Sequence, residues 1–476
     1  MSKIPAPTTP APTTPAHLSM IPAGPPTASA PRPFLFPEPV RAQAPWGGEI
    51  AAARVSTVPV VHARFAFRTG AVALAVRPPA PGLDGAALSR LITPVLRHGI
   101  GPWDAPGLAA HLDRMGARFS LALGQDQSAL SASGFAHDLD KLLALLRTAM
   151  TEASAGDKAM EREREKSLQY LHHQLADPGA IAGAWMGRAL YGHHPYSGPM
   201  ATEPGLQSIT GDHIDHAWAA LCDPRDSLLL IVGDVDPHEA IDKALACFAG
   251  IPVPPRAPVL PAAPPPPAPT TVGVLRPGSE QLTVQVGVRM FERTHPDWLP
   301  MRIAHQILGA GASSRLFLRL REAQGLTYDA WSQLDGALLG GDLTCGLAAA
   351  TDRARAALDA LNAELKAFVD DPPSQLELEA AQRNVVGSFP GKASGVGGVA
   401  RLLSVAWMYG LPTDHWARYP ATVSALTRDA LVTAIRKHVH PDGFSTVIIG
   451  PQAAVDAALE DHPQALKVPL QAPPLP

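Results

Sequence analysis

Proline is distributed so unevenly along this chain that it separates segments that can build a folded core from segments that cannot. Of the 51 prolines in 476 residues, 12 lie in residues 1–40, 10 in residues 252–269 and 4 in residues 469–476. Proline fixes φ and lacks an N–H donor, so dense runs of it form extended spacers. We therefore expect a disordered Pro/Thr/Ala-rich tail at 1–40, a linker at 252–269 and a short tail at 469–476. Two blocks remain, 41–251 and 270–468.

The two blocks have nearly equal length and carry the same features in the same order. Each opens with alternating apolar and polar residues, the pattern of a half-buried strand, and continues with apolar residues at helical spacing. Each ends in a short apolar run that predicts a buried strand. The matched features are 61–67 with 284–290, 88–96 with 299–308, Gly116 with Gly325, 191–192 with 409–410, and 228–233 with 446–450. The sequence predicts an α+β protein of two homologous domains, each an antiparallel sheet covered by helices.

Charge and composition exclude several classes of function. Lys plus Arg total 39 and Asp plus Glu total 43, and a net charge of −4 is not that of a protein that binds the nucleic-acid backbone. No apolar run reaches the roughly 18 residues that a membrane span needs, and the N-terminus has no hydrophobic signal segment. The three cysteines, Cys222, Cys247 and Cys345, are too scattered for a disulfide framework. We expect no nucleic-acid partner, no membrane span and a cytoplasmic location.

The most specific motif lies in the second block. Residues 308–328 contain Ser314-Arg315-Leu, then Leu-Arg321-Glu322, Gly325-Leu and Tyr328. This segment resembles the second-domain motif S-R-L-x-x-x-L-R-E-x-x-G-L-x-Y of the insulinase/pitrilysin class of metallopeptidases, in the bacterial subfamily similar to the mitochondrial processing peptidase. First-domain landmarks of that class resemble 194–196 (His-Pro-Tyr) and 233–235 (Gly-Asp-Val). The resemblance covers both blocks and implies half of a clamshell peptidase that closes around an extended peptide.

Active members of this class carry the zinc motif H-x-x-E-H on a helix, and this chain does not. None of its 18 histidines is four residues from another, so the motif cannot exist in any register. The segment 85–99 corresponds to the helix that carries the motif in active members. Alignment on Gly85 places residues 88, 91 and 92 (Leu, Leu, Ile) at the His, Glu and His positions, whereas alignment on Gly99 places Arg90, Thr93 and Pro94 there. The third ligand of the class, a downstream Glu, falls at Gln169 or Tyr170. We expect no metal in this chain and no hydrolysis of peptides by it alone.

The Arg and Tyr of the second-domain motif are retained as Arg321 and Tyr328. In the family these residues reach across the clamshell toward the substrate, and a guanidinium and a phenol can both donate to a peptide carbonyl. Aligning Gly116 with Gly325 places Leu112 and Phe119 at the equivalent positions of the first block. The resemblance therefore assigns Arg321 and Tyr328 as substrate-binding residues and gives the first block no such pair.

These features favour a non-catalytic, substrate-binding subunit of a heterodimeric zinc peptidase, with zinc held by a homologous partner subunit and a peptide as the substrate. Two alternatives remain open. One is a structural or assembly protein that keeps the peptidase fold, and the other is a dedicated maturation subunit for a ribosomally made peptide precursor. Two weaker patterns are interpreted without a site: 387–394 as a flexible Gly-rich loop, and His438-Val-His440 as a solvated helix end.

Overall fold

The computed structural model describes residues 35–253, 261–263 and 265–474. The residues from Leu35 onward form one compact unit. The interpretation of 1–40 as a disordered tail falls almost entirely outside the described residues, and the predicted linker at 252–269 falls partly outside them. In the described part of the chain, no helix combines the length and the apolar character that a bilayer crossing needs.

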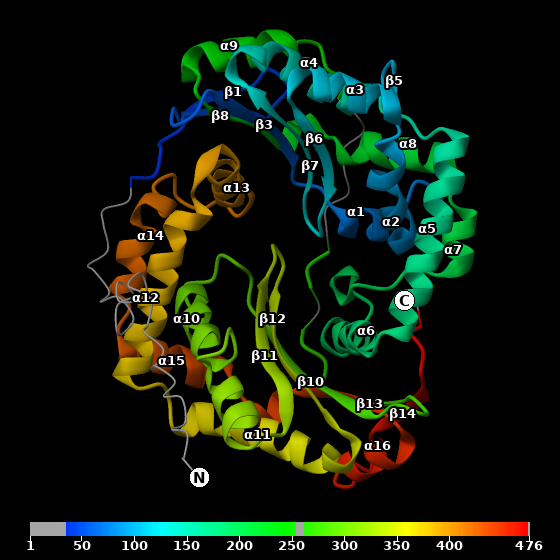
Figure 1. The fold of residues 1–476 in the computed structure, drawn as a ribbon, viewed down its shortest axis with the longest axis vertical. Helices are drawn as coiled ribbons and strands as arrows, with labels where there is room; N and C mark the ends of the chain where they lie inside the picture. Colours follow the sequence, from blue (N-terminus) through cyan, green and yellow to red (C-terminus); the bar gives the residue numbers. More distant parts are fainter. Residues whose placement is uncertain (1–34, 254–260, 264, 475–476) are drawn as a thin grey trace, which may run out of the picture. The chain divides into compact units, whose positions relative to one another are not determined.

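The first half of the described chain builds a six-stranded sheet, in the order β1-β2-β8-β3-β7-β6 (Figure 1). Its strands are β1 (Val40–Gln43), β2 (Glu49–Arg54), β3 (Val60–Phe67), β6 (Arg118–Leu123), β7 (Ser128–Phe135) and β8 (Ser227–Gly233). Its helices are α1 (Ala71–Val76), α2 (Gly85–Leu96), α3 (Ala105–Met115), α4 (Leu139–Thr151), α5 (Asp157–Ala176), α6 (Pro178–Tyr191), α7 (Glu203–Ser208), α8 (Gly211–Leu221) and α9 (Pro237–Cys247). Two short strands, β4 (Gly99–Ile100) and β5 (Trp103–Asp104), pair as a separate two-stranded sheet. Alternation along β3 buries Val61, Ala63 and Phe65 completely, as the period-2 pattern predicts.

The second half builds another six-stranded sheet, in the order β11-β12-β10-β13-β9-β14. Its strands are β9 (Thr271–Leu275), β10 (Gln281–Met290), β11 (Thr327–Gly336), β12 (Gly341–Ala350), β13 (Ser445–Gly450) and β14 (Leu466–Pro469). Its helices are α10 (Trp298–Leu308), the π-helical segment η5 (Phe317–Ala323), α11 (Ala354–Asp370), α12 (Gln375–Lys392), α13 (Gly395–Met408), α14 (His415–Ser424), α15 (Arg428–His438) and α16 (Gln452–Ala458). The C-terminal segment beyond β14 packs as well, because Trp185 Nε1 donates to the carbonyl of Gln471 at 2.8 Å.

The α+β class and the two helix-covered sheets are confirmed. Most strand pairs are antiparallel, as expected, but each sheet also contains parallel pairs: β2 with β8, and β9 with both β13 and β14. Strands β8 and β13 return after long helical connections, and a connection of that length allows a parallel neighbour. The alternation visible inside one strand carries no information about the direction of such a distant partner.

Each half contributes one helix that packs on the sheet of the other half, an arrangement that the sequence does not predict. Helix α6 of the first half packs on β10 and β13 of the second sheet, and α13 of the second half packs on β8 and β3 of the first (Figure 1). Both contacts are apolar: Ile181 and Met186 of α6 lie in one buried cluster, and Val399 and Leu403 of α13 lie in another. The opposite faces carry α4 and α9 on the first sheet and α11 and α16 on the second. Both helices end at the duplicated Tyr-Gly pairs, so α6 and α13 are equivalent elements of the two halves. Each of them packs on the sheet of the other half, and the exchange is therefore reciprocal.

The interpretation of 387–394 as a flexible Gly-rich loop is wrong. The segment 387–394 is not a loop, because α12 runs through it to Lys392 and α13 begins at Gly395. Gly387, Pro390 and Gly391 lower its helical propensity, yet Phe389 is almost fully buried against the aromatic residues of α14. Burial of that face outweighs the local preference of these residues for a turn.

Candidate functional site

Arg321 and Tyr328 are brought together by a helix end and the strand that follows it. Arg321 lies near the end of η5, Gly325 turns the chain with φ of +59°, and Tyr328 is the second residue of β11. The guanidinium carbon of Arg321 lies 4.6 Å from the ring centroid of Tyr328 and 4.6 Å from that of Phe317. The two aromatic faces therefore fix the guanidinium through cation–π contacts.

A β-bulge exposes the tyrosine. Thr327 pairs with Ala349 and Ala330 with Leu347, so β11 has one residue more than β12 across this step. The extra residue leaves both Tyr328 and Asp329 exposed, and Tyr328 is 83% exposed. The Thr327 hydroxyl holds the bulge, accepting from the Asp329 N–H at 3.1 Å. Bulges re-aim side chains, and here the bulge directs a phenol outward from an edge strand.

The matched positions in the first half are built differently. Helix α3 ends at Gly116 with φ of +58°, as η5 is followed by Gly325, but α3 is a regular α-helix and β6 pairs with β7 without a bulge. Leu112 and Phe119 are partly buried and pack against the core of the first half. The π-helical segment and the bulge are therefore specific to the half that carries Arg321 and Tyr328, and π-turns often occur at functional sites.

Arg321 and Tyr328 have few internal partners. The acidic group nearest to the Arg321 guanidinium is its neighbour Glu322, with Nε to Oε1 at 3.4 Å. Neither residue lines the two large cavities described below. Because β11 is at the edge of its sheet, an extended peptide can approach both groups from outside. The exposed Tyr328 and the partly exposed Arg321 therefore present their donors at the surface, outside both cavities.

The first arginine of the same motif has a structural role instead. The Arg315 side chain is 9% exposed and makes a two-point contact with Glu377, Nε to Oε1 at 2.6 Å and Nη2 to Oε2 at 2.9 Å. Its Nη1 donates to the carbonyl of Asp371 at 2.7 Å. Glu377 also closes a capping box with Ser374 at the start of α12. Arg315 therefore fastens the segment before η5 to the N-terminus of α12.

The structure decides between the two alignments of the missing zinc motif. Leu88, Leu91 and Ile92 are completely buried in the first core, so they cannot face a ligand. Arg90, Thr93 and Pro94 instead line a cavity of about 570 Å³ between α2 and α5, together with Tyr170.

These side chains do not fit zinc. Zinc is held by thiolate, imidazole or carboxylate groups, and an arginine, a threonine, a proline and a tyrosine supply none of them. The guanidinium carbon of Arg90 lies 3.8 Å from the ring centroid of Tyr170, so a side-chain cation occupies the space where a metal would need anionic or neutral donors.

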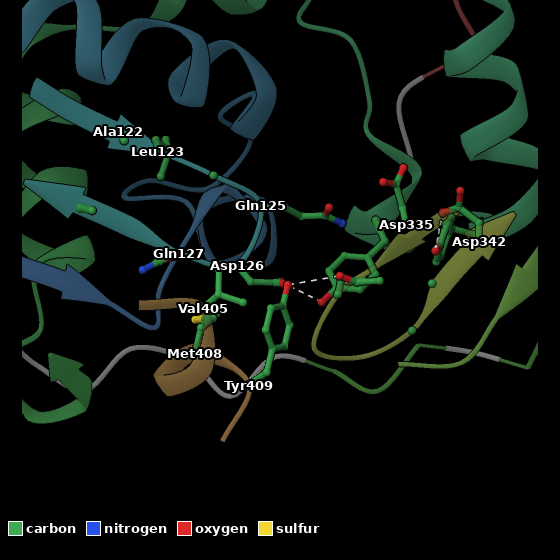
Figure 2. A pocket seen from close by; sticks show the side chains of 18 of the residues that line it. Ala122, Leu123, Gln125, Asp126, Gln127, Asp335, Asp342, Val405, Met408 and Tyr409 are labelled. Atoms are coloured by element: carbon green, nitrogen blue, oxygen red, sulfur yellow. Dashed lines mark hydrogen bonds between the residues drawn. The ribbon is translucent and has the colours of Figure 1, made fainter. Parts of the chain in front are cut away.

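Sequence reasoning missed a second cavity, of about 610 Å³, where the exchanged helices end (Figure 2). Two carboxyl groups in it accept from tyrosines: Asp126 from Tyr196 at 2.8 Å, and Asp342 from Tyr191 at 2.9 Å. Burial raises the pKa of both acids, that of Asp342 to about 6. The Asp126 carboxylate also accepts from the Leu338 N–H at 3.2 Å, which links the β6–β7 turn to the β11–β12 turn. The sequence feature that could have indicated this cavity is the duplicated tyrosine, because Tyr191 and Tyr409 both line it.

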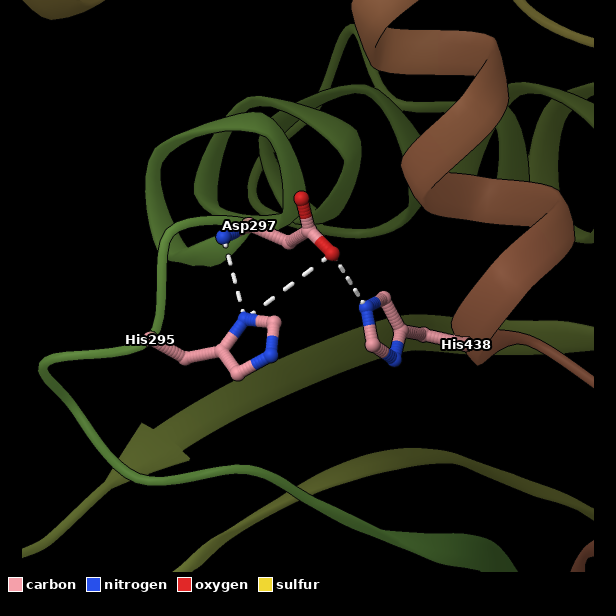
Figure 3. Close-up of side chains that lie close together, drawn as sticks. All are labelled: His295, Asp297 and His438. Carbon is pink, nitrogen blue, oxygen red and sulfur yellow. Dashed lines mark hydrogen bonds and ion pairs between the residues drawn. The ribbon is translucent and has the colours of Figure 1, made fainter.

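A cluster of His295, Asp297 and His438 is the group of three potential ligands that the described residues bring close enough to surround a metal ion (Figure 3). One carboxylate oxygen, Oδ2 of Asp297, and one ring nitrogen, Nδ1 of His295, are already engaged within the protein. The Asp297 carboxylate accepts from His438 Nε2 and from the Lys437 ammonium, both at 2.7 Å, and His295 Nδ1 accepts from the Asp297 N–H at 3.0 Å. Lys437 and then His438 hold the pKa of Asp297 below its usual range. The cluster joins α10 to α15, so the interpretation of His438 as solvated is wrong: its side chain is 15% exposed.

Comparisons with known proteins match part of this chain to peptidases. A family model described as "Peptidase M16 inactive domain" matches residues 208–385, a span that includes Arg321 and Tyr328. An uncharacterized zinc protease of Mycobacterium leprae is 24% identical over 241 residues, 48% of this chain and 53% of that protein. A similar protein of Streptomyces coelicolor is 23% identical over 266 residues, 54% of this chain and 57% of that protein. The match thus spans about half the length of these curated relatives.

Solved structures extend the likeness of the fold to most of the chain. A protein from Pseudomonas fluorescens, described as a peptidase M16 inactive domain, superposes with a TM-score of 0.78 at 21% identity, covering 87% of this chain and 98% of that one. A protease from Helicobacter pylori superposes with a TM-score of 0.76 at 16% identity, covering 88% of this chain and all of that one. At these identities the likeness shows the fold.

Proposed function

We propose that this chain, which belongs to the insulinase-like M16 peptidase family, is a non-catalytic, substrate-binding subunit of a two-subunit zinc metallopeptidase. The observation that carries the proposal is the Arg321–Tyr328 pair, two donors stacked against each other, with Tyr328 exposed on the edge strand β11 and Arg321 partly exposed beside it on η5. The partner would be a homologue that carries H-x-x-E-H and the downstream Glu, and its zinc would supply the attacking water.

The chemistry of the pair supports a role in holding the substrate. A guanidinium has five N–H donors and a phenol has one, so together they can hold a peptide carbonyl and the negative charge that develops on its oxygen during hydrolysis. The π-helical segment, the turn at Gly325 and the bulge at Tyr328 all orient these groups before any peptide arrives. Donors oriented in advance stabilise a transition state without a reorganisation cost.

The strand that carries Tyr328 supports a mode of binding. As the edge of its sheet, β11 presents backbone groups that a peptide can pair with as an added strand. Main-chain pairing gives affinity without demanding one side-chain sequence, while Arg321 and Tyr328 would fix the register of the scissile bond. A location in the cytoplasm belongs to the same proposal.

The test is an Arg321→Ala variant assembled with the zinc-bearing homologue. We expect turnover of a peptide substrate to fall by roughly 10² to 10³, the scale for loss of one oxyanion donor. Tyr328→Phe keeps the stacked ring and removes the hydroxyl, and should cost about tenfold, the equivalent of one hydrogen bond. Arg114→Ala is the matched control, because Arg114 is an exposed arginine in the last turn of the counterpart helix α3.

Gel filtration must show that each variant still assembles. Unchanged turnover in an assembled Arg321→Ala complex would contradict the proposal and would favour the alternative of a structural or assembly protein. Activity confined to a single precursor peptide would favour the dedicated maturation subunit.

A further inference from the structure

We propose that the cavity between α2 and α5 binds a carboxylate attached to an apolar group, such as the C-terminal residue of a peptide, with Arg90 as the anion-binding group. The inference concerns this chain alone and does not rest on a partner subunit. The face of α2 that lines this cavity, where the family resemblance places zinc ligands, carries the Arg90 guanidinium instead.

The cavity is large enough for a ligand of several residues. Its volume of about 570 Å³ lies within the range of sites that bind small molecules. Helices α1, α2 and α5 form its walls, and the segment 195–201 and the turn after β6 close its ends. These elements belong to the first half of the chain, whose core positions α2 rigidly.

The charge of the lining is positive. Of the described residues that line the cavity, Arg90 is the one that carries a charge at neutral pH, and none of them is an aspartate or glutamate. The Arg90 guanidinium stacks on Tyr170, with 3.8 Å from its carbon to the ring centroid, and no ion pair to Arg90 occurs among the described residues. Stacking fixes the plane of the guanidinium and leaves its N–H edge available for the two oxygens of a carboxylate.

Neutral groups complete the polar end. Ser167 is 4% exposed and lines the cavity, as do Gln125 and Gln174. Within the described residues, the side chains of these three make no hydrogen bond, and none of their polar atoms is both buried and unpaired, so they remain available to a ligand or to water. A ligand that accepts hydrogen bonds would supply partners for these groups.

The rest of the lining selects the class of ligand. Val72, Leu123, Leu171 and Met200 give the cavity an apolar wall. A single guanidinium balances the one charge of a carboxylate, whereas a phosphate carries up to two charges and would need further cations. An apolar residue with a free carboxylate therefore matches both the charge and the wall.

The test uses the full chain and isothermal titration calorimetry with N-acetyl-Leu-Leu as the probe. We expect the free acid to bind and its C-terminal amide to bind at least tenfold more weakly. Arg90→Gln should weaken binding of the acid at least tenfold. Arg97→Gln is the matched control, since Arg97 is an exposed arginine at the end of the same helix that does not line the cavity, and it should leave the affinity unchanged.

Acetate distinguishes the source of the carboxylate. Binding of acetate as tight as that of the dipeptide, and lost in Arg90→Gln, would assign the site to small carboxylic acids, while weaker binding of acetate supports a peptide terminus. Equal affinity for acid and amide, an unchanged affinity in Arg90→Gln, or no binding of the acid at millimolar concentration would overturn the inference. Arg90 is exposed on its helix, so its replacement should leave the fold intact, and circular dichroism verifies this.

Discussion

Replacing Arg315 with alanine should destabilise the protein more than replacing an exposed arginine with alanine does. The substitution removes the two-point contact to Glu377 and the hydrogen bond to the Asp371 carbonyl, all made by a side chain that is 9% exposed. It also removes the guanidinium that lies 5.6 Å from the Phe368 ring centroid. The Glu377 carboxylate remains in its capping box with Ser374, without its cation.

The magnitude follows from how far water can replace the lost partner. Breaking a fully buried ion pair costs about 3–5 kcal/mol, because a charge is left without solvent or partner. The Glu377 side chain is 33% exposed, so water can reach it, and hydrogen bonds to a charged group are each worth about 1.5–3 kcal/mol. We expect Arg315→Ala to lower the free energy of unfolding by about 2–3 kcal/mol.

Urea denaturation followed by circular dichroism measures this cost. Arg355→Ala is the control, because Arg355 contacts three carboxylates that are 62–76% exposed, and such surface pairs contribute about 1 kcal/mol or less. If Arg315→Ala costs no more than Arg355→Ala, the structural role assigned to Arg315 is wrong.

The pH dependence gives a second readout of the same pair. Arg315 first, and the Ser374 contacts after it, lower the pKa of Glu377 to about 2. A carboxyl whose pKa is depressed on folding stabilises the native state above its unfolded pKa, near 4.5, and loses that contribution as the pH falls toward 2. The difference between the original protein and Arg315→Ala should therefore be full at neutral pH and shrink below about pH 4.5.

Two further predictions concern burial and backbone. Burial raises the pKa of Asp342 from 3.8 to about 6, so the ionised carboxylate destabilises the native state above pH 6 and not below pH 3.8. The Asp342→Asn variant should therefore raise the melting temperature more at pH 7.5 than at pH 4.5, and an equal change at both pH values would contradict this. Gly325→Ala should lower the free energy of unfolding, measured by urea denaturation, by about 1–2 kcal/mol; this cost comes from the positive φ alone, since a Cβ there meets no atom within 4 Å. Gly116→Ala should lower it more, because its Cβ would also lie 3.2 Å from Phe135. A larger loss for Gly325→Ala than for Gly116→Ala would refute the reasoning.

The sequence predicts what local pattern determines. Alternation identifies the central strands β3 and β10, and glycines with a required left-handed conformation mark the matched turns at Gly116 and Gly325. The duplicated order of features identifies two sheets of the same kind. The candidate pair was found through the motif, and the structure brings Arg321 and Tyr328 into contact.

Features that depend on tertiary packing could not be predicted in this way. The π-helical segment that contains Arg321 and the bulge at Tyr328 have no counterpart in the described residues of the first half, although both halves share the same landmarks. The extension of α12 through Pro390 depends on burial of Phe389, and the exchange of α6 and α13 depends on faces that lie far apart in the sequence. Which residues of α2 face the cavity depends on which of its residues are buried in the core, and the sequence alone left both alignments possible.

The central claim is that this subunit supplies substrate-binding groups while a homologous partner supplies the metal. It is tested most directly by measuring zinc content and peptide cleavage for the purified chain, for a homologue with H-x-x-E-H, and for the two together. We predict no stoichiometric zinc and no cleavage for this chain alone, and chelator-sensitive cleavage by the assembled pair. One zinc per chain with cleavage by the lone protein would contradict the account.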